Sequence, residues 1–146
     1  MAVLSVNAGS STLKFSLYPL SHGKVQAQLL SGCIEGLEPG GAPELRWTFQ
    51  GQTQSKALSL AANHRFAQAL MCLRELLAEL PGALRMQAVA HRVVHGGSKY
   101  RASVLVTEVV LAELTQLISL APLHQPHNLE GVRAFTLAFP DVPQVA

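Results

Sequence analysis

The sequence has little charge, few aromatic residues, two cysteines and no long hydrophobic run. Of its 146 residues, 14% are charged and 5% are aromatic, the net charge is +2, and lysines and arginines form no cluster, so nothing indicates a nucleic-acid partner. No uninterrupted apolar segment reaches the ~18 residues of a membrane span, and no basic stretch followed by an apolar one marks a secretory signal. We therefore expect neither nucleic acid nor membrane as a partner.

Two isolated cysteines provide no disulfide framework. Cys33 and Cys72 lie in apolar surroundings and form no C-x-x-C pair, so we expect two buried, reduced thiols. Reduced thiols suit a cytoplasmic protein. Hydrophobic residues make up 49% of the chain, which is enough for the core of one domain and too much for a disordered chain.

Hydrophobic periodicity predicts an α/β layer whose first two strands form an antiparallel hairpin. Residues 2–6 are an apolar run, and residues 13–17 alternate between apolar and polar side chains. Further strands are expected at residues 25–34, 45–49, 86–90 and at the end of the chain, with a loop at 36–43 and a turn at 51–55. Helices are expected at residues 58–80 ending at Pro81-Gly82, from the N-cap Thr107 to Pro122, and at 129–138 with Asn128 as the cap.

The first polar cluster lies in "VNAGSSTLKFSL", residues 6–17, at the tip of the expected hairpin. Gly9 permits a close backbone approach, Ser10, Ser11 and Thr12 add hydroxyl groups, and Lys14 adds a positive charge. Phosphate is the ligand that this combination favours, although a Walker A loop is missing. A polar hairpin tip without a ligand explains the same residues.

The second cluster is "HRVVHGG", residues 91–97, at the end of a predicted buried strand. Arg92 in this place needs a partner, either a carboxylate or phosphate ligand or an internal Asp or Glu. His-Gly-Gly also occurs in the oxyanion loop of α/β-hydrolases, but the G-x-S-x-G elbow of those enzymes is missing.

The third cluster is "APLHQPHN", residues 121–128. His124 and His127, together with His91 and His95, raise a metal hypothesis, but no thiolate or group of acidic residues completes a site. Loop histidines that bond to the backbone, or a histidine directed at a ligand oxygen, are the alternatives.

In this order and at these separations, the stretches "VNAGSSTLKFSL", "HRVVHGGSKY" and "APLHQPHNLEGV" resemble the N-terminal part of the acetate kinase family. The resemblance covers the whole chain and is weakest between residues 22 and 55. It implies a ribonuclease-H-like domain of the superfamily that includes actin, heat-shock proteins and sugar kinases, with a mixed sheet. It also implies reversible phosphoryl transfer from ATP to acetate, giving acetyl phosphate and ADP, with Mg²⁺ or Mn²⁺.

The resemblance assigns roles to residues of the first cluster. Asn7 matches the family's metal-binding asparagine, and Lys14 matches a position assigned to ATP. Ser10 and Thr12 match hydroxyl groups near the phosphates, with Thr12 in place of the commoner serine.

The resemblance also assigns the acceptor side of the site. Arg92 matches an arginine that binds the substrate carboxylate or the transferring phosphoryl group, and Val94 and Leu123 match walls of the pocket for the acetate methyl group. His124 matches a histidine beside the substrate, and Gln125 replaces the family's usual asparagine.

By this resemblance, residues 1–146 are an incomplete N-terminal domain, because the family continues into a catalytic aspartate and a second, nucleotide-binding domain. We therefore expect the chain alone to be inactive and the full-length enzyme to be a homodimer. A propionate or butyrate kinase of the same family, a non-catalytic module that binds acetate or phosphate, and a serine hydrolase using Ser10 or Ser11 are the alternatives.

Overall fold

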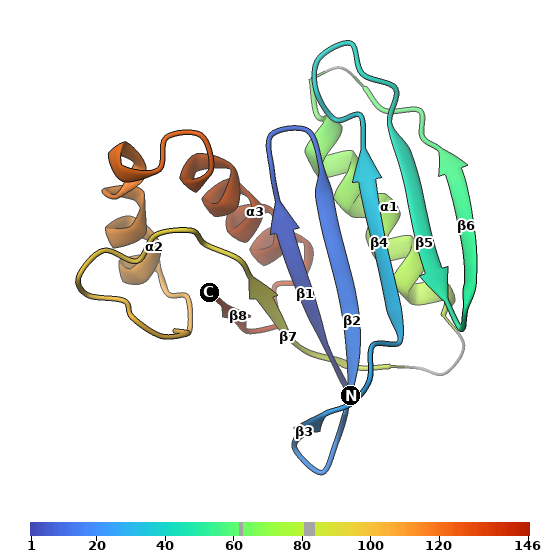
Figure 1. Ribbon diagram of the computed structural model, residues 1–146, viewed down its shortest axis with the longest axis horizontal. Coiled ribbons are helices and arrows are strands. Elements are labelled where there is room, and N and C mark those ends of the chain that lie inside the picture. The colour runs from blue at the N-terminus through green and yellow to red at the C-terminus, as the bar shows by residue number, and fades with distance from the viewer. Residues whose placement is uncertain (62, 81–83) are drawn as a thin grey trace.

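The computed structural model describes residues 1–61, 63–80 and 84–146, which form a mixed sheet with helices packed on it (Figure 1). The elements are β1 (Ala2–Ala8), β2 (Leu13–Ser21), β3 (Lys24–Val25), β4 (Leu30–Glu35), β5 (Glu44–Phe49), β6 (Gln52–Ala57), α1 (Arg65–Glu79), β7 (Met86–His91), α2 (Glu108–Thr115), the 3-10 helix η1 (Ile118–Leu120), α3 (Gln125–Ala138) and β8 (Gln144–Val145). The strand order is β6-β5-β4-β2-β1-β7-β8, with β3 paired to β2. The strands β1, β7 and β8 run parallel, and β1, β2, β4, β5 and β6 pair antiparallel. The expected α/β class with an antiparallel front hairpin is confirmed.

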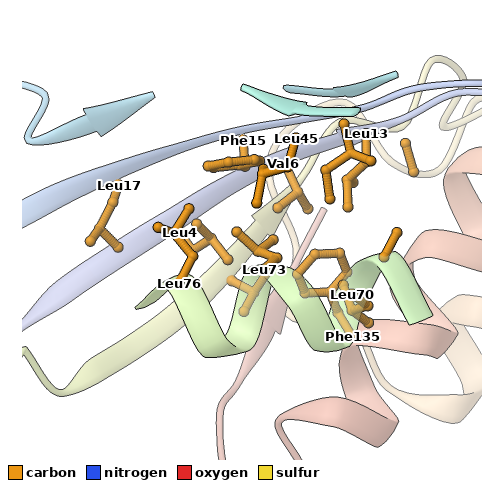
Figure 2. Close-up of a cluster of buried hydrophobic side chains, with 14 of the residues drawn as sticks. Leu4, Val6, Leu13, Phe15, Leu17, Leu45, Leu70, Leu73, Leu76 and Phe135 are labelled. Carbon is orange, nitrogen blue, oxygen red and sulfur yellow. The ribbon is translucent and has the colours of Figure 1, made fainter. Parts of the chain in front are cut away.

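The core lies between one face of the sheet and the helices α1 and α3. In β1 and β2 the core side chains alternate with polar ones, and Leu4 and Leu13 are fully buried. Figure 2 shows these leucines between the strands and the two helices, with Leu73 of α1 and Phe135 of α3 below them. Burying one such side chain stabilises the fold by roughly 1.5–3 kcal/mol, so this layer holds β1 and β2 firmly in place.

The opposite face of the same strands carries polar side chains. Because successive side chains of a strand point to opposite faces, Asn7 and Lys14 point away from the core that Val6 and Leu13 enter. Asn7 and Lys14 are directly opposite each other in the β1–β2 pairing. The hydrophobic pattern of the hairpin therefore also decides where these two polar groups lie.

Two predictions about the front strands were wrong. Residues 51–55 were expected to be a turn, but the turn is at Gln50 and Gly51, both with positive φ, and β6 follows at once. Every residue of β6 is exposed, so this edge strand lacks the alternation by which a strand is predicted. The strand expected at residues 25–34 is divided into β3 and β4.

Several helix boundaries differ from those expected, whereas the N-cap of α2 and the end of α3 at Ala138 agree with the prediction. Arg65 begins α1, and Pro81 and Gly82, expected to end it, lie outside the described residues. Thr107 is confirmed as the N-cap of α2, because its hydroxyl accepts a hydrogen bond from the Val110 N–H at 3.3 Å. That helix ends at Thr115 and not at Pro122.

The third helix begins earlier than expected. Gln125 is its first residue, so Asn128 lies inside the first turn and is not the cap. None of the helices within the described ranges is long and apolar enough to cross a membrane. Cys33 and Cys72 are unpaired and half-buried, where full burial was expected. Burial raises the pKa of both thiols.

Candidate functional site

A cleft of about 350 Å³ lies at the carboxyl ends of the neighbouring strands β1 and β7. Its lining residues are Asn7, Ala8, Gly9, Thr12, Lys14, Arg92, Val94, His124 and Asn128. They come from the β1–β2 hairpin, the loop after β7 and the beginning of α3 (Figure 1). The three polar clusters, which are far apart in the sequence, therefore meet at one place.

The β1–β2 hairpin forms the first wall of the cleft. The Gly9 N–H donates a hydrogen bond to the Thr12 carbonyl oxygen at 2.9 Å, which closes a tight turn. A Cβ on Gly9 would lie 3.3 Å from the Thr12 hydroxyl oxygen, so a larger residue would crowd that group. Asn7 and Lys14 are a cross-strand pair, and the Cβ atoms of such pairs are about 4.5–5.5 Å apart. An amide, a hydroxyl group and a cation therefore share this wall.

The parallel pairing of β7 with β1 brings Arg92 to the second wall. Val6 pairs with His91, and the Arg92 N–H donates to the Val6 carbonyl oxygen at 3.1 Å. Arg92 is exposed, and the ion pairs between described residues are Arg46–Glu44 and Lys99–Glu113, neither of which uses it. Its guanidinium group is thus available to a ligand at the carboxyl ends of parallel strands, where α/β sheets usually bind ligands.

His124 stands at the third wall, immediately before α3. It occupies the N-cap position but makes no capping hydrogen bond with its side chain, and the side chain is exposed. Pro126 follows in the first turn, where its missing N–H breaks no helical hydrogen bond. The imidazole of His124 can therefore turn toward a ligand in the cleft.

The metal hypothesis raised by the four histidines has no support among the described residues. His91 is buried, and the His95 Nδ1 accepts a hydrogen bond from the Gly97 N–H at 2.9 Å. Within the described part of the chain, no group of three or more His, Cys, Asp or Glu side chains is placed to hold a metal ion. Of these histidines, His124 is the one that lines the cleft.

His91 is a buried residue at the end of β7 that contacts β8 and α3. Burial lowers the pKa of its imidazole below the ordinary value, and the hydrogen bond to Gln144 offsets part of this effect. The Gln144 amide donates to the Val142 carbonyl oxygen, so its Oε1 faces the His91 Nε2 at 2.6 Å and that nitrogen carries the proton. The ring also packs edge-on against Phe135, with 5.4 Å between the ring centres. A neutral His91 thus joins β7 to β8 and to α3.

Most of the residues expected at the site line this cleft, and two do not. Asn7, Thr12, Lys14, Arg92, Val94 and His124 line it. Ser10 is exposed at the tip of the hairpin, and Leu123 is 78% exposed; neither is among the lining residues.

Asn128 lines the cleft but was expected only as a helix cap. Its side-chain amide donates to the Ala8 carbonyl oxygen at 2.9 Å, a contact between residues 120 positions apart. A neighbouring sequence pattern cannot indicate such a distant partner. The one available signal in the sequence was an asparagine next to a segment with two prolines. Because that pattern is also typical of helix caps, it did not indicate a residue of the cleft.

Comparison with known proteins identifies the family. The family model described as "Acetokinase family" matches residues 2–146. The chain belongs to the acetokinase family. An acetate kinase of Shewanella baltica (strain OS155) is 41% identical over 145 residues, and one of Shewanella sp. (strain W3-18-1) is 39% identical over 144 residues. Each alignment covers 99% of this chain and 35% of the relative, so the chain spans about a third of the length of these acetokinases.

Solved structures of the acetokinase family have the same fold as this chain. A propionate kinase from Francisella tularensis superposes with a TM-score of 0.86 at 30% identity, and an acetate kinase from Porphyromonas gingivalis with a TM-score of 0.82 at 33% identity. Each likeness covers 99% of this chain and 36% of the other one. The expected fold, a ribonuclease-H-like domain of the actin-like superfamily, is thereby confirmed.

Proposed function

We propose that this chain supplies one wall of the active site of an acetate kinase, an enzyme that transfers a phosphoryl group reversibly between ATP and acetate. The observation that carries the proposal is the cleft, which gathers Lys14, Arg92 and His124 with no acidic side chain among its described lining residues. Two permanent cations in a cleft with no carboxylate among its described lining residues are suited to anionic ligands. Glu35 lies on the far side of Lys14, where both line a separate pocket. The family membership narrows those anions to a short carboxylate and a nucleotide's phosphates.

The chemistry of the reaction fits these residue types. A carboxylic acid with a pKa near ~4 is ionised at neutral pH, so acetate needs no general base. Its difficulty is the approach of one anion to another, and phosphoryl transfer is accelerated mainly by positioning and by positive charge. A well-placed arginine is worth ~10³-fold or more in related transfers.

The proposed roles follow the walls of the cleft. Arg92 binds the acetate carboxylate or the transferring phosphoryl group, and His124 stands beside the acceptor. Lys14 and Thr12 face the phosphates of ATP or ADP, with Ser10 close by on the same turn. The N-terminus of α3, with no acidic residue in its first turn, adds the positive end of the helix dipole.

The residues of the cleft fit a metal ion that is bound mainly by phosphate. Asn7 offers one neutral amide oxygen, which is a hard ligand of the kind that Mg²⁺ and Mn²⁺ prefer. The bound ion would neutralise charge on the phosphates. No carboxylate is among the described lining residues, so the cleft itself offers the ion no negative charge. Phosphate oxygens would therefore provide most of the binding, and the Asn7 amide would add one neutral ligand.

We also propose that residues 1–146 correspond to the N-terminal domain and that a second, nucleotide-binding domain supplies the remaining groups. The relatives support this division because this chain spans about 35% of their length. In the complete protein, a homodimer in the cytoplasm, the second domain would bring the carboxylate and the further cations that this cleft lacks. The 146-residue chain alone should bind anions without turning them over.

The test measures acetyl phosphate formation from MgATP and acetate by the protein expressed from its complete gene. Arg92→Ala should lower kcat/KM by ~10³-fold, whereas Arg101→Ala, which removes an exposed arginine outside the cleft, should leave it unchanged. Equal activity of the two variants would contradict the proposal. Turnover by residues 1–146 alone would contradict the division into domains.

The acceptor is tested by comparing acetate, propionate and butyrate. We propose acetate because the relatives at 41% and 39% identity are named acetate kinases. Val94, beside Arg92 in the cleft, and Leu123 are proposed walls of the methyl pocket and are compatible with a longer acyl group as well. A higher kcat/KM with propionate would instead assign the chain to the propionate kinases, one of which is among its structural relatives.

A further inference from the structure

Gln125 is a fully buried polar residue between two parts of the candidate site. It is the first residue of α3, directly after His124, and its side chain has 0% exposure. Its Oε1 accepts a hydrogen bond from the His95 N–H at 3.3 Å, and its Nε2 donates to the carbonyl oxygens of His95 at 2.9 Å and Leu114 at 3.3 Å. Because Nε2 faces two acceptors, the orientation of the amide is fixed.

The segment that Gln125 holds is the loop that carries Arg92 and Val94. After Arg92 pairs with Val6, the chain leaves the sheet, and His95 is the next residue whose backbone is tied to another element. Both polar groups of the His95 main chain bond to this one amide. The Leu114 carbonyl oxygen, near the end of α2, bonds to the same nitrogen. One side chain therefore joins the loop, α2 and α3.

A second buried amide in the first turn of α3, that of Asn128, contacts the opposite wall of the cleft. Asn128 donates to the Ala8 carbonyl oxygen at 2.9 Å, between Asn7 and Gly9 of the β1–β2 hairpin. The first turn of α3 thus carries two buried amides, one bonded to each wall of the cleft. Asn128 bonds to a strand that is also held by its neighbours in the sheet, and its Oδ1 is buried without a hydrogen-bond partner among the described residues. Gln125 instead bonds to the part of the loop beyond Arg92, which has left the sheet.

We propose that Gln125 is a positioning residue, which sets the distance and direction of Arg92 and Val94 relative to His124 by fixing the main chain of His95. It touches no ligand in the cleft, since it is not a lining residue. The identity of the ligand in this inference rests on the proposed function. The clamp, by which we mean the hydrogen bonds from Gln125 to the main chain of His95, rests on those hydrogen bonds alone. Its loss should leave the sheet folded and the loop free to move.

The experiment uses the 146-residue chain and three variants. Gln125→Met keeps the size of the side chain and removes all three hydrogen bonds, and Gln125→Glu places an oxygen against two carbonyl oxygens. Gln116→Met is the matched control, because Gln116 is exposed and its side chain makes no hydrogen bond to another described residue. Amide hydrogen exchange is followed by NMR at His95 and at Val89 in the core of β7.

Both Gln125 variants should speed exchange at the His95 N–H by about tenfold or more while Val89 stays protected. Titration with inorganic phosphate, observed at the Arg92 Nε–H, should show an affinity about three- to tenfold weaker than in the wild type. The Gln116 variant should match the wild type in both measurements. Equal loss of protection at Val89 would make Gln125 a general stability residue and would overturn the proposal, as would unchanged exchange at His95.

Two outcomes separate this inference from the proposed function. A wild-type chain that does not respond to phosphate at Arg92 counts against the proposed function, while exchange at His95 still decides the clamp. If neither Gln125 variant folds, the wild type itself provides the test. Its Gln125 side-chain NH₂ protons should exchange at least about tenfold more slowly than those of Gln116, and equal rates would overturn the clamp.

Discussion

The contact between Gly131 of α3 and Ala8 of β1 makes a quantitative prediction. A Cβ built on Gly131 would lie 2.8 Å from the Ala8 Cβ, whereas carbon atoms in good contact are about 3.5–4.0 Å apart. Gly131→Ala therefore requires α3 and β1 to separate by roughly 1 Å. The same movement stretches the hydrogen bond from Asn128 to the Ala8 carbonyl oxygen, one turn earlier on the helix.

Two opposing effects decide whether Gly131→Ala raises or lowers the free energy of unfolding. Alanine is a better helix former than glycine by about 1 kcal/mol. Overpacking a filled contact costs about 1–3 kcal/mol, and the Ala8 Cβ cannot rotate out of the way because it is fixed to the backbone of a central strand. We expect a net loss of about 1–2 kcal/mol in the free energy of unfolding, and so a Tm lower by several degrees.

Urea unfolding of the 146-residue chain, followed by circular dichroism, measures this loss in a double-mutant cycle. Ala8→Gly alone should cost about 1 kcal/mol, because it removes a buried methyl group and loosens the strand. In the double variant the new methyl group of residue 131 takes the vacated space, so the double variant should be about 1–2 kcal/mol more stable than additivity predicts. Additive effects within about 0.5 kcal/mol, or a Gly131→Ala variant more stable than the wild type, would refute the proposed close approach.

Three further predictions use other parts of the chain. Arg92→Ala should abolish the response of the 146-residue chain to inorganic phosphate, measured by calorimetry, whereas Arg101→Ala should keep it. Thr107→Ala should lower the free energy of unfolding by about 1 kcal/mol and Thr107→Ser by much less, since the hydroxyl group that caps α2 is lost in the first and kept in the second. Because burial lowers the pKa of His91 below its ordinary value of 6.5, the unfolded state binds a proton before the folded state does as the pH falls. This contribution to stability should therefore be complete above pH 6.5 and be lost below it, with a slope of at most about 1.4 kcal/mol per pH unit. A His91→Asn variant should lack that slope, and parallel stability curves of variant and wild type would show the assignment to be wrong.

The parts of the fold that were predicted from the sequence are those with a buried face. The stripe that includes Leu70 and Leu73 predicted α1, and the alternation from Leu13 to Leu17 predicted β2. By contrast, β6 has no buried residue and depends on pairing with β5 through its backbone, which no side-chain pattern records. An edge strand of this kind has no signal in the sequence apart from its turn.

The polar clusters could be located in the sequence because they follow strand ends, where the sequence changes abruptly from apolar to polar, but the roles of their residues came from the family resemblance and stay predictions. Arg92 after β7 and Gly9 after β1 are of this kind. The contacts that join these walls could not be predicted, because they depend on how α3 packs. Asn128 had the sequence features of a cap, and only the tertiary fold brings it to Ala8. Likewise, nothing near Gln125 in the sequence indicates that its amide bonds to His95.

Around the cleft, the buried polar side chains are neutral and the permanently charged ones are exposed. The polar side chains buried beside it, Gln125, Asn128 and His91, are two neutral amides and an imidazole whose pKa is lowered. The exposed residues Lys14 and Arg92 carry the permanent charges. A buried ion would need a counter-ion within the fold, and that counter-ion would weaken the attraction of the cleft for anions. Neutral amides hold the walls by hydrogen bonds instead, so the positive charge at the rim stays available to anionic ligands.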